Sequence, residues 1–182
     1  MQRLFLTKRG TQVPSKSNKH EAVPHFTAPL SELENVIREV LESGGEFSLV
    51  TAGTSMLPLL RNRKDTVVLA KHEGRLCKYD IPLYKRDSGQ FTLHRVLKVK
   101  NDEYYICGDN QLVIEKGITD KHVIAVVKRI VRNGKTIDLQ NSFAYKIYVF
   151  FWCRCFFVRY TALKFRALGS RIKKFFINSN KK

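Results

Sequence analysis

Residues 46–140 form a series of short β-type runs separated by turn signals, and this pattern limits the possible folds more than any other feature. The turns include Asp87-Ser88-Gly89 and Asn133-Gly134, which are typical hairpin connections. The runs lie at 46–51, 65–70, 80–86, 91–99, 104–107, 122–131 and 135–139. Short strands at this spacing predict a mainly β domain over 46–140, either a sandwich or a partly coiled, barrel-like sheet.

Two different segments precede this domain. Residues 1–29 are polar and basic and contain three prolines, which predicts a disordered basic arm. Residues 30–45 predict an amphipathic helix, because Ser31 and Glu34 have capping-box spacing and Gly44-Gly45 ends the apolar periodicity. The apolar residues at helical spacing are Leu33, Val36, Ile37, Val40 and Leu41.

The net charge of +17 lies mostly in the last part of the chain. Residues 31–140 carry 18 basic and 15 acidic side chains, whereas residues 141–182 carry ten basic and no acidic ones. This last part also holds eight of the twelve phenylalanines and the only tryptophan, which predicts a basic, aromatic helical tail. Such a tail fits an anionic membrane surface through residues 143–176, packing on the domain, or single-stranded nucleic acid. The nearly balanced middle argues against a general nucleic-acid binder.

The four cysteines, which include Cys153 and Cys155, form no C-x-x-C motif and indicate neither a metal site nor a disulfide framework. No cofactor is indicated either. No run reaches the roughly 18–20 uncharged apolar residues of a membrane-spanning helix. These features predict a cytoplasmic protein, peripheral at the inner face of the membrane if the tail binds lipid.

Ser55 is the candidate nucleophile. It lies in Gly53-Thr54-Ser55-Met56-Leu57-Pro58, a stretch with the composition of a loop. Among five histidines, His94 is the candidate base because the run 91–99 is expected to hold it rigidly in a strand. Alternation places Phe91, Leu93, Leu97 and Val99 on the core face and Thr92, His94 and Val96 on the other. A histidine base predicts activity that falls below about pH 6–7.

Asp109 is the candidate supporting acid, because its carboxylate could orient and stabilise the imidazole of the base. It lies in the turn Gly108-Asp109-Asn110, after the run 104–107. The stretch that contains Ser55, then His94-Arg95-Val96, then Gly108-Asp109-Asn110 resembles, in order, the signature boxes of type I signal peptidases. The wider superfamily includes the LexA-like repressors. The resemblance covers roughly residues 46–131.

The resemblance implies a signal-peptidase/LexA-like coiled β-sheet fold with the serine on a loop beside a substrate groove. A histidine opens the second box, as in the branch that uses a Ser/His mechanism. It implies Ser55 as nucleophile, His94 as general base and Asp109 as supporting acid, with Glu115 and Asp120 as alternative acids. It also implies that Gly53, Thr54, Met56 and Pro58 would bind the oxyanion and the substrate.

The expected activity is therefore that of a serine endopeptidase, a small form without the family's membrane anchor, that cleaves a leader or precursor peptide after a small residue. Gly53 departs from the family, because many bacterial members have a serine there that helps to bind the oxyanion. Two other functions are open on the same fold. One is a non-catalytic module that binds peptide, membrane or nucleic acid; the other is a LexA-like regulator, although residues 1–45 offer only one good helix.

Overall fold

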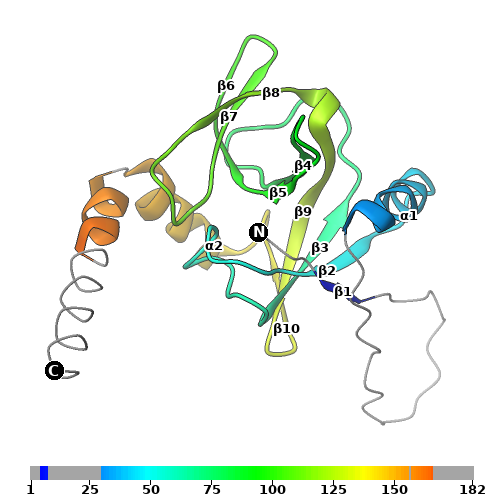
Figure 1. Ribbon diagram of the computed structural model, residues 1–182. Helices are drawn as coiled ribbons and strands as arrows, with labels where there is room; N and C mark the ends of the chain where they lie inside the picture. Colours follow the sequence, from blue (N-terminus) through cyan, green and yellow to red (C-terminus); the bar gives the residue numbers. More distant parts are fainter. Residues whose placement is uncertain (1–4, 8–29, 156, 166–182) are drawn as a thin grey trace, which may run out of the picture.

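The computed structural model describes residues 5–7, 30–155 and 157–165, and this part of the chain is mainly β (Figure 1). The larger sheet is curled and antiparallel, with strand order β1-β2-β3-β9-β4-β5 and with β10 paired to β9. Its strands are β1 (Phe5–Thr7), β2 (Phe47–Val50), β3 (Asp65–Ala70), β4 (Pro82–Lys85), β5 (Phe91–Leu93), β9 (Val123–Arg132) and β10 (Lys135–Asp138). The predicted runs at these positions, 91–99 excepted, are therefore confirmed as strands to within a few residues.

The chain leaves the larger sheet at His94 and enters a second sheet. This smaller sheet has the order β6-β7-β8 and consists of β6 (Arg95–Lys100), β7 (Glu103–Cys107) and β8 (Glu115–Ile118). The single strand predicted over 91–99 is thus wrong, because His94 separates β5 from β6. The predicted alternation fails for the same reason: Val96 is fully buried in the second sheet's core, whereas Leu97 is only partly buried.

Two strands lie where the sequence gives no strand signal. β8 has the sequence Glu-Lys-Gly-Ile, which lacks apolar alternation, and it forms by pairing with β7. β1 lies inside the predicted disordered arm and pairs with β2, from Phe5 opposite Val50 to Thr7 opposite Ser48. The arm prediction is therefore wrong for residues 5–7, and the rest of it lies outside the described residues.

Helix α1 (Leu30–Glu42) packs one apolar stripe against the larger sheet. Ile37 and Leu41 are buried, whereas Val36 is 39% exposed and does not join the predicted apolar face. The helix ends before Gly44, whose φ of 78° is the left-handed conformation that favours glycine. The amphipathic helix is thus confirmed, but the side chain of Ser31 is outside the described part. Glu34 accepts hydrogen bonds from Arg38 and Lys85.

The described residues bury two apolar cores. The larger core lies between α1 and the larger sheet and includes Ile37, Leu49, Val67, Leu83 and Ile130. The smaller core lies between the two sheets and contains Leu76, Tyr84, Val96, Tyr104, Ile106, Ile118 and Val126. His94 lies where the two cores meet, because Leu93 belongs to the first core and Val96 to the second.

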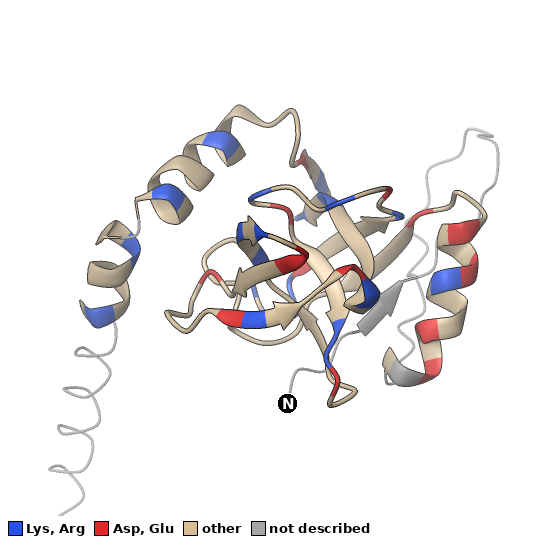
Figure 2. Ribbon diagram, turned by 90° about the horizontal axis from the view of Figure 1, so that it is seen from above, with Lys and Arg blue, Asp and Glu red and all other residues tan. Residues whose placement is uncertain are grey.

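The C-terminal segment runs along the side of the sheets away from α1 (Figures 1 and 2). It begins with α2 (Phe143–Tyr148), continues as the π-helix η2 (Val149–Arg154), and is helical again over 157–165. The helical part of the predicted tail is therefore present over these residues, and 166–182 lie outside the described part. Within the described residues, no helix has the length and apolarity needed to cross a membrane.

Candidate active site

The loop that carries Ser55 is closed at its base by the buried carboxylate of Asp65. Arg61 and Arg132 both donate to this carboxylate, at 2.9 and 2.6 Å, and the backbone N–H of Arg61 donates to it as well. The carbonyl of Asp65 accepts from the backbone and the hydroxyl of Thr51, at 3.0 and 3.1 Å. Residues 51 and 65 are thereby held together, so that the segment between them is a fixed loop.

Within this loop, Ser55 is partly buried and Pro58 is exposed. Met56 is 5% exposed and packs in the larger core, so it anchors the loop. Gly53 has a φ of 105°, and its N–H donates to the side-chain oxygen of Asn62 at 2.8 Å. The Gly53 N–H is therefore already occupied, and the donor that the resemblance implies for the oxyanion is the backbone N–H of Ser55.

A small hollow lies beside Ser55. Its lining includes Gly53, Ser55, Met56, Leu60 and Leu93, and its volume is about 10 Å³. This is roughly the space of one water molecule, so only a methyl-sized group fits without rearrangement. The hollow is therefore suited to a small side chain of a peptide.

His94 is 4% exposed and is held by a short chain of polar contacts. Its Nδ1 lies 3.3 Å from the hydroxyl of Tyr84, which donates to the carboxylate of Glu115 at 2.8 Å. Arg86 also donates to Glu115, at 2.6 Å. Because the Tyr84 hydrogen is directed to Glu115, the Tyr84 oxygen can accept from Nδ1–H of His94. That tautomer leaves the lone pair on Nε2, as a general base requires.

The environment also keeps His94 uncharged. Burial lowers the pKa of His94 to about 4, and the charge of Arg86 acts in the same direction. Although burial raises the pKa of Glu115, hydrogen bonds from Arg86 and Tyr84 bring it below its ordinary value, so this carboxylate is ionised. His94 is therefore neutral down to lower pH than the sequence-based expectation of about pH 6–7.

Ser55 and His94 converge on Gly108. A Cβ placed on Gly108 would lie 2.6 Å from the carbonyl oxygen of Ser55 and 3.0 Å from Nε2 of His94. Asn110 fixes this approach, because its N–H donates to the Ser55 carbonyl at 2.7 Å and its side-chain amide donates to the Thr54 carbonyl at 3.0 Å. The three quoted sequence boxes thus meet in one place. Nε2 itself is buried and makes no hydrogen bond to any described residue.

Asp109 does not contact His94 in the predicted way. Its carboxylate accepts two hydrogen bonds from Arg95, at 2.8 and 2.7 Å, and one from the hydroxyl of Tyr148 at 2.9 Å. Arg95 and Asp109 are both fully buried. The guanidinium of Arg95 binds the carboxylate in bidentate geometry. It therefore occupies the carboxylate oxygens that the imidazole would need. The hydrogen bond expected from Asp109 to His94 is therefore replaced by an ion pair with Arg95.

Of the two alternative acids, Glu115 reaches His94 through Tyr84, whereas Asp120 has a different partner. Asp120 accepts from the hydroxyl of Tyr104 beside the short 3₁₀ helix η1 (Asp120–His122). The Tyr84–Glu115 link was missed in the sequence because Tyr84 appears there only as one residue of a predicted strand.

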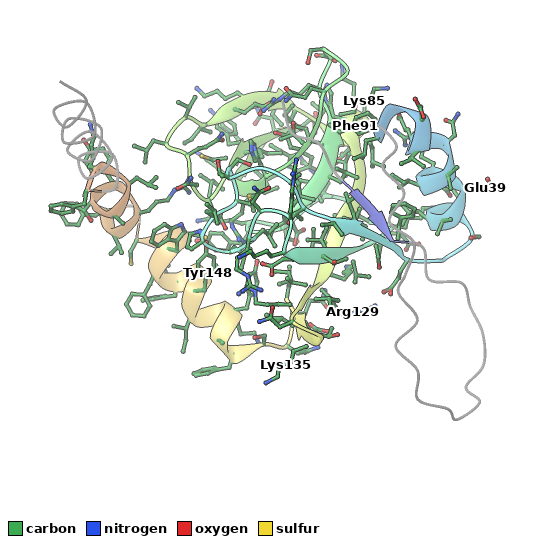
Figure 3. All side chains as sticks on the ribbon, turned by 60° about the horizontal axis from the view of Figure 1, so that its bottom comes forward. Glu39, Lys85, Phe91, Arg129, Lys135 and Tyr148 are labelled. Carbon is green, nitrogen blue, oxygen red and sulfur yellow. The ribbon has the colours of Figure 1, made fainter. Side chains whose placement is uncertain are left out.

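The C-terminal segment contributes contacts that sequence reasoning did not assign. Trp152 donates from Nε1 to the carbonyl of Asp109 at 2.9 Å, next to the Tyr148 contact. Figure 3 shows Tyr148 on the side of α2 that faces the strands. The fully buried Arg159 donates to the carbonyls of Gly108 and Gln111. Of the three roles open for the tail, packing on the domain is thus seen for Tyr145, Tyr148, Trp152 and Arg159.

No family model, no curated protein and no solved structure matches the chain. Over the described residues, no cluster of histidine, cysteine or acidic side chains could hold a metal ion. The four cysteines are free, and burial raises the pKa of Cys153 to about 12.

Proposed function

We propose that the protein is a serine endopeptidase with a signal-peptidase/LexA-like fold, Ser55 as nucleophile and His94 as general base. The observation that carries this proposal is the convergence of the Ser55 loop and His94 on Gly108. The position of a Cβ on Gly108 lies 2.6 Å from the carbonyl oxygen of Ser55 and 3.0 Å from Nε2 of His94. A neutral, rigidly held imidazole whose open nitrogen lies beside a serine loop is the arrangement that nucleophilic acyl transfer needs.

In this mechanism Nε2 of His94 takes the Ser55 proton as Oγ attacks the peptide carbonyl. The imidazolium that forms is stabilised through Tyr84 by the ionised Glu115, which replaces the direct carboxylate contact of a conventional triad. The backbone N–H of Ser55 donates to the oxyanion, and Thr54 lies beside it. The proton then passes from Nε2 to the leaving amine, and water repeats the sequence to release the acyl group.

The substrate that fits best is an extended leader or precursor peptide with a small residue before the cleaved bond. The hollow beside Ser55 holds only a methyl-sized group. In the described part of the larger sheet, β5 is the last strand of its path and leads directly into His94. An extended peptide added along that edge would pass the proposed catalytic residues.

The test is cleavage of a proteome-derived peptide library by the full chain, with the products identified by mass spectrometry. We expect cleavage after small residues in the wild type and none in Ser55→Ala or His94→Gln. Ser88→Ala is the matched control, because Ser88 is exposed in a hairpin turn. Unchanged cleavage by purified Ser55→Ala would refute the proposal, and binding of peptide without cleavage by the wild type would favour the non-catalytic module.

A further inference from the structure

The C-terminal segment, described over 143–155 and 157–165, has one side fixed to the domain. The hydroxyl of Tyr145 accepts from Arg95 at 2.6 Å, and Tyr148 and Trp152 both bond to Asp109. Cys153 and Arg159 are buried on the same side. Tyr145, Tyr148 and Trp152 set the rotation of the helical part over 143–154, and Arg159 sets that of the part over 157–165, so the opposite sides are held facing outward.

That outward side is unusually apolar. Phe143 and Phe157 are 75% and 76% exposed, and Phe165 is 72% exposed. We call the exposed residues Phe143, Ile147, Phe150, Phe151, Phe157 and Phe165 the outer stripe. Before residue 143, the described chain exposes only three large hydrophobic side chains, none of them aromatic. A concentration of exposed aromatic residues on one segment marks a binding surface rather than ordinary protein surface.

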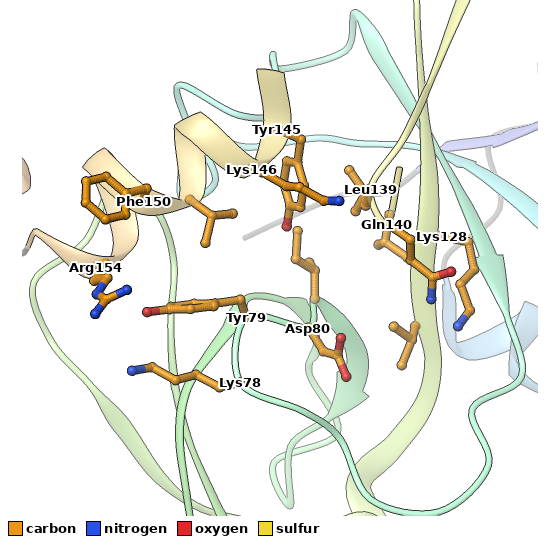
Figure 4. Close-up of a pocket in the computed structure, with 14 residues that line it drawn as sticks. Lys78, Tyr79, Asp80, Lys128, Leu139, Gln140, Tyr145, Lys146, Phe150 and Arg154 are labelled. Carbon is orange, nitrogen blue, oxygen red and sulfur yellow. The ribbon is translucent and has the colours of Figure 1, made fainter. Parts of the chain in front are cut away.

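A cavity of about 360 Å³ adjoins the outer stripe, and Phe150 belongs to both. Its walls include Ile81, Leu139 and Val149, and four cations lie around it: Lys78, Lys128, Lys146 and Arg154. In the view of Figure 4, Lys78 and Arg154 lie at one end of the cavity and Lys128 at the other. The four make no ion pair with any described residue.

Among the described residues that line the cavity, Asp80 is the only acid, and it already accepts from the backbone N–H of Cys77 at 2.7 Å. Tyr79, on the same wall, has a φ of 81°, a strained conformation for a bulky residue. It is held there by its N–H bond to Val96 at 2.7 Å and by the Arg95 bond to its carbonyl at 3.1 Å. The cavity is thus built by the fold, with apolar walls and an excess of positive charge.

We propose that this surface, the outer stripe together with the cationic cavity, docks the protein on an anionic lipid bilayer. The phenylalanines would enter the interface between headgroups and acyl chains, and the cavity cations would bind phosphate-bearing headgroups. Charge complementarity selects this occupant, because residues 141–182 hold ten basic and no acidic side chains. Figure 2 shows Lys and Arg, but no Asp or Glu, along the C-terminal helical parts over 143–154 and 157–165. The same charge opposes docking of a second copy through this surface.

The experiment is co-sedimentation of the full chain with vesicles, either phosphatidylcholine alone or phosphatidylcholine with phosphatidylglycerol, at low and high salt. We expect binding only to the phosphatidylglycerol vesicles and a loss of binding at high salt. Lys146→Gln/Arg154→Gln should weaken binding at least tenfold, because each cation near such a surface contributes measurably. The charge-matched control is Lys98→Gln/Lys100→Gln on β6, two exposed cations away from the outer stripe, which should bind like the wild type.

Phe150→Ser/Phe151→Ser tests the apolar half of the surface. Both side chains are about half exposed, so the midpoint of thermal unfolding should fall by only a few degrees while vesicle binding falls at least tenfold. Ser55→Ala should bind vesicles like the wild type, so this proposal stands or fails separately from the proposed peptidase activity. Equal binding by the Lys146→Gln/Arg154→Gln variant and its control would overturn it. Two other results would also overturn the proposal if the wild type does not bind vesicles. One is self-association of the wild type that the Phe150→Ser/Phe151→Ser variant loses, and the other is salt-sensitive binding of the wild type to RNA.

Discussion

Asp109→Asn should destabilise the fold through Arg95 rather than disable His94 directly. The Asp109 carboxylate accepts two hydrogen bonds from Arg95 and one from Tyr148, and neither member of the ion pair is exposed. Removing the negative charge leaves a buried guanidinium without its counter-ion, which typically costs about 3–5 kcal/mol. Since the amide keeps part of the hydrogen bonding, we expect Asp109→Asn near the lower value and Asp109→Ala near the upper one.

Urea unfolding at neutral pH measures this loss of free energy, and Glu42→Gln is the control. Glu42 forms an ion pair with Lys71 at 2.5 Å, but both side chains are substantially exposed, at 68% and 44%. Such surface pairs contribute about 0–1 kcal/mol. In addition, Arg95→Met combined with Asp109→Asn should cost less than the sum of the two single changes by at least about 1 kcal/mol, because they share one interaction.

Unfolding of Asp109→Asn at the same urea concentration as Glu42→Gln would refute a stabilising role for the buried ion pair. If Asp109→Asn instead keeps its stability, loses cleavage and shifts the pH profile of the remaining cleavage, Asp109 is the supporting acid for His94.

Three further predictions concern the same region. Gly108→Ala should lower peptide cleavage at least tenfold and cost about 1–3 kcal/mol, because its Cβ would lie 2.6 Å from the Ser55 carbonyl oxygen; wild-type cleavage rates would contradict this. Because burial lowers the pKa of His94 to about 4, against 6.5 in the unfolded chain, the unfolded state binds this proton first as pH falls. Denaturation measured from pH 7 to 4 should therefore show His94→Gln losing about 3 kcal/mol less stability than the wild type. Arg159→Met should cost about 1–3 kcal/mol in urea unfolding, because two buried carbonyls lose their donor, whereas the exposed Lys164→Met should change stability by less than about 0.5 kcal/mol.

Local signals in the sequence predict most of the strands and α1, since both depend on periodicity within a few residues. No local signal in the sequence predicts that the strand expected over 91–99 is divided at His94. The division arises because Leu93 packs in one core and Val96 in the other, and each core is assembled from strands distant in the sequence. β8 is missed for a related reason, since its partner β7 rather than its own composition makes it a strand.

For the candidate site, the order of the three boxes predicts which loops come together, and Gly108, Ser55 and His94 do converge. The partners of the side chains are less accessible to sequence reasoning. Asp109 has the right chemical type to orient an imidazole, but Arg95 competes for it with a permanent charge and two donors. The Tyr84–Glu115 link depends on a contact between residues 31 positions apart, for which no spacing rule exists.

The packing of the C-terminal segment on Asp109 has a consequence for the order of events during synthesis. A growing chain that ends after β10 (Lys135–Asp138) already contains Ser55, His94 and Glu115. It still lacks Tyr148, Trp152 and Arg159, which hold the turn that follows β7. Because chains fold from the N-terminus as they leave the ribosome, this turn is secured only after the C-terminal segment has emerged. A peptidase built in this way would gain its activity only after its own strands are folded and protected from cleavage.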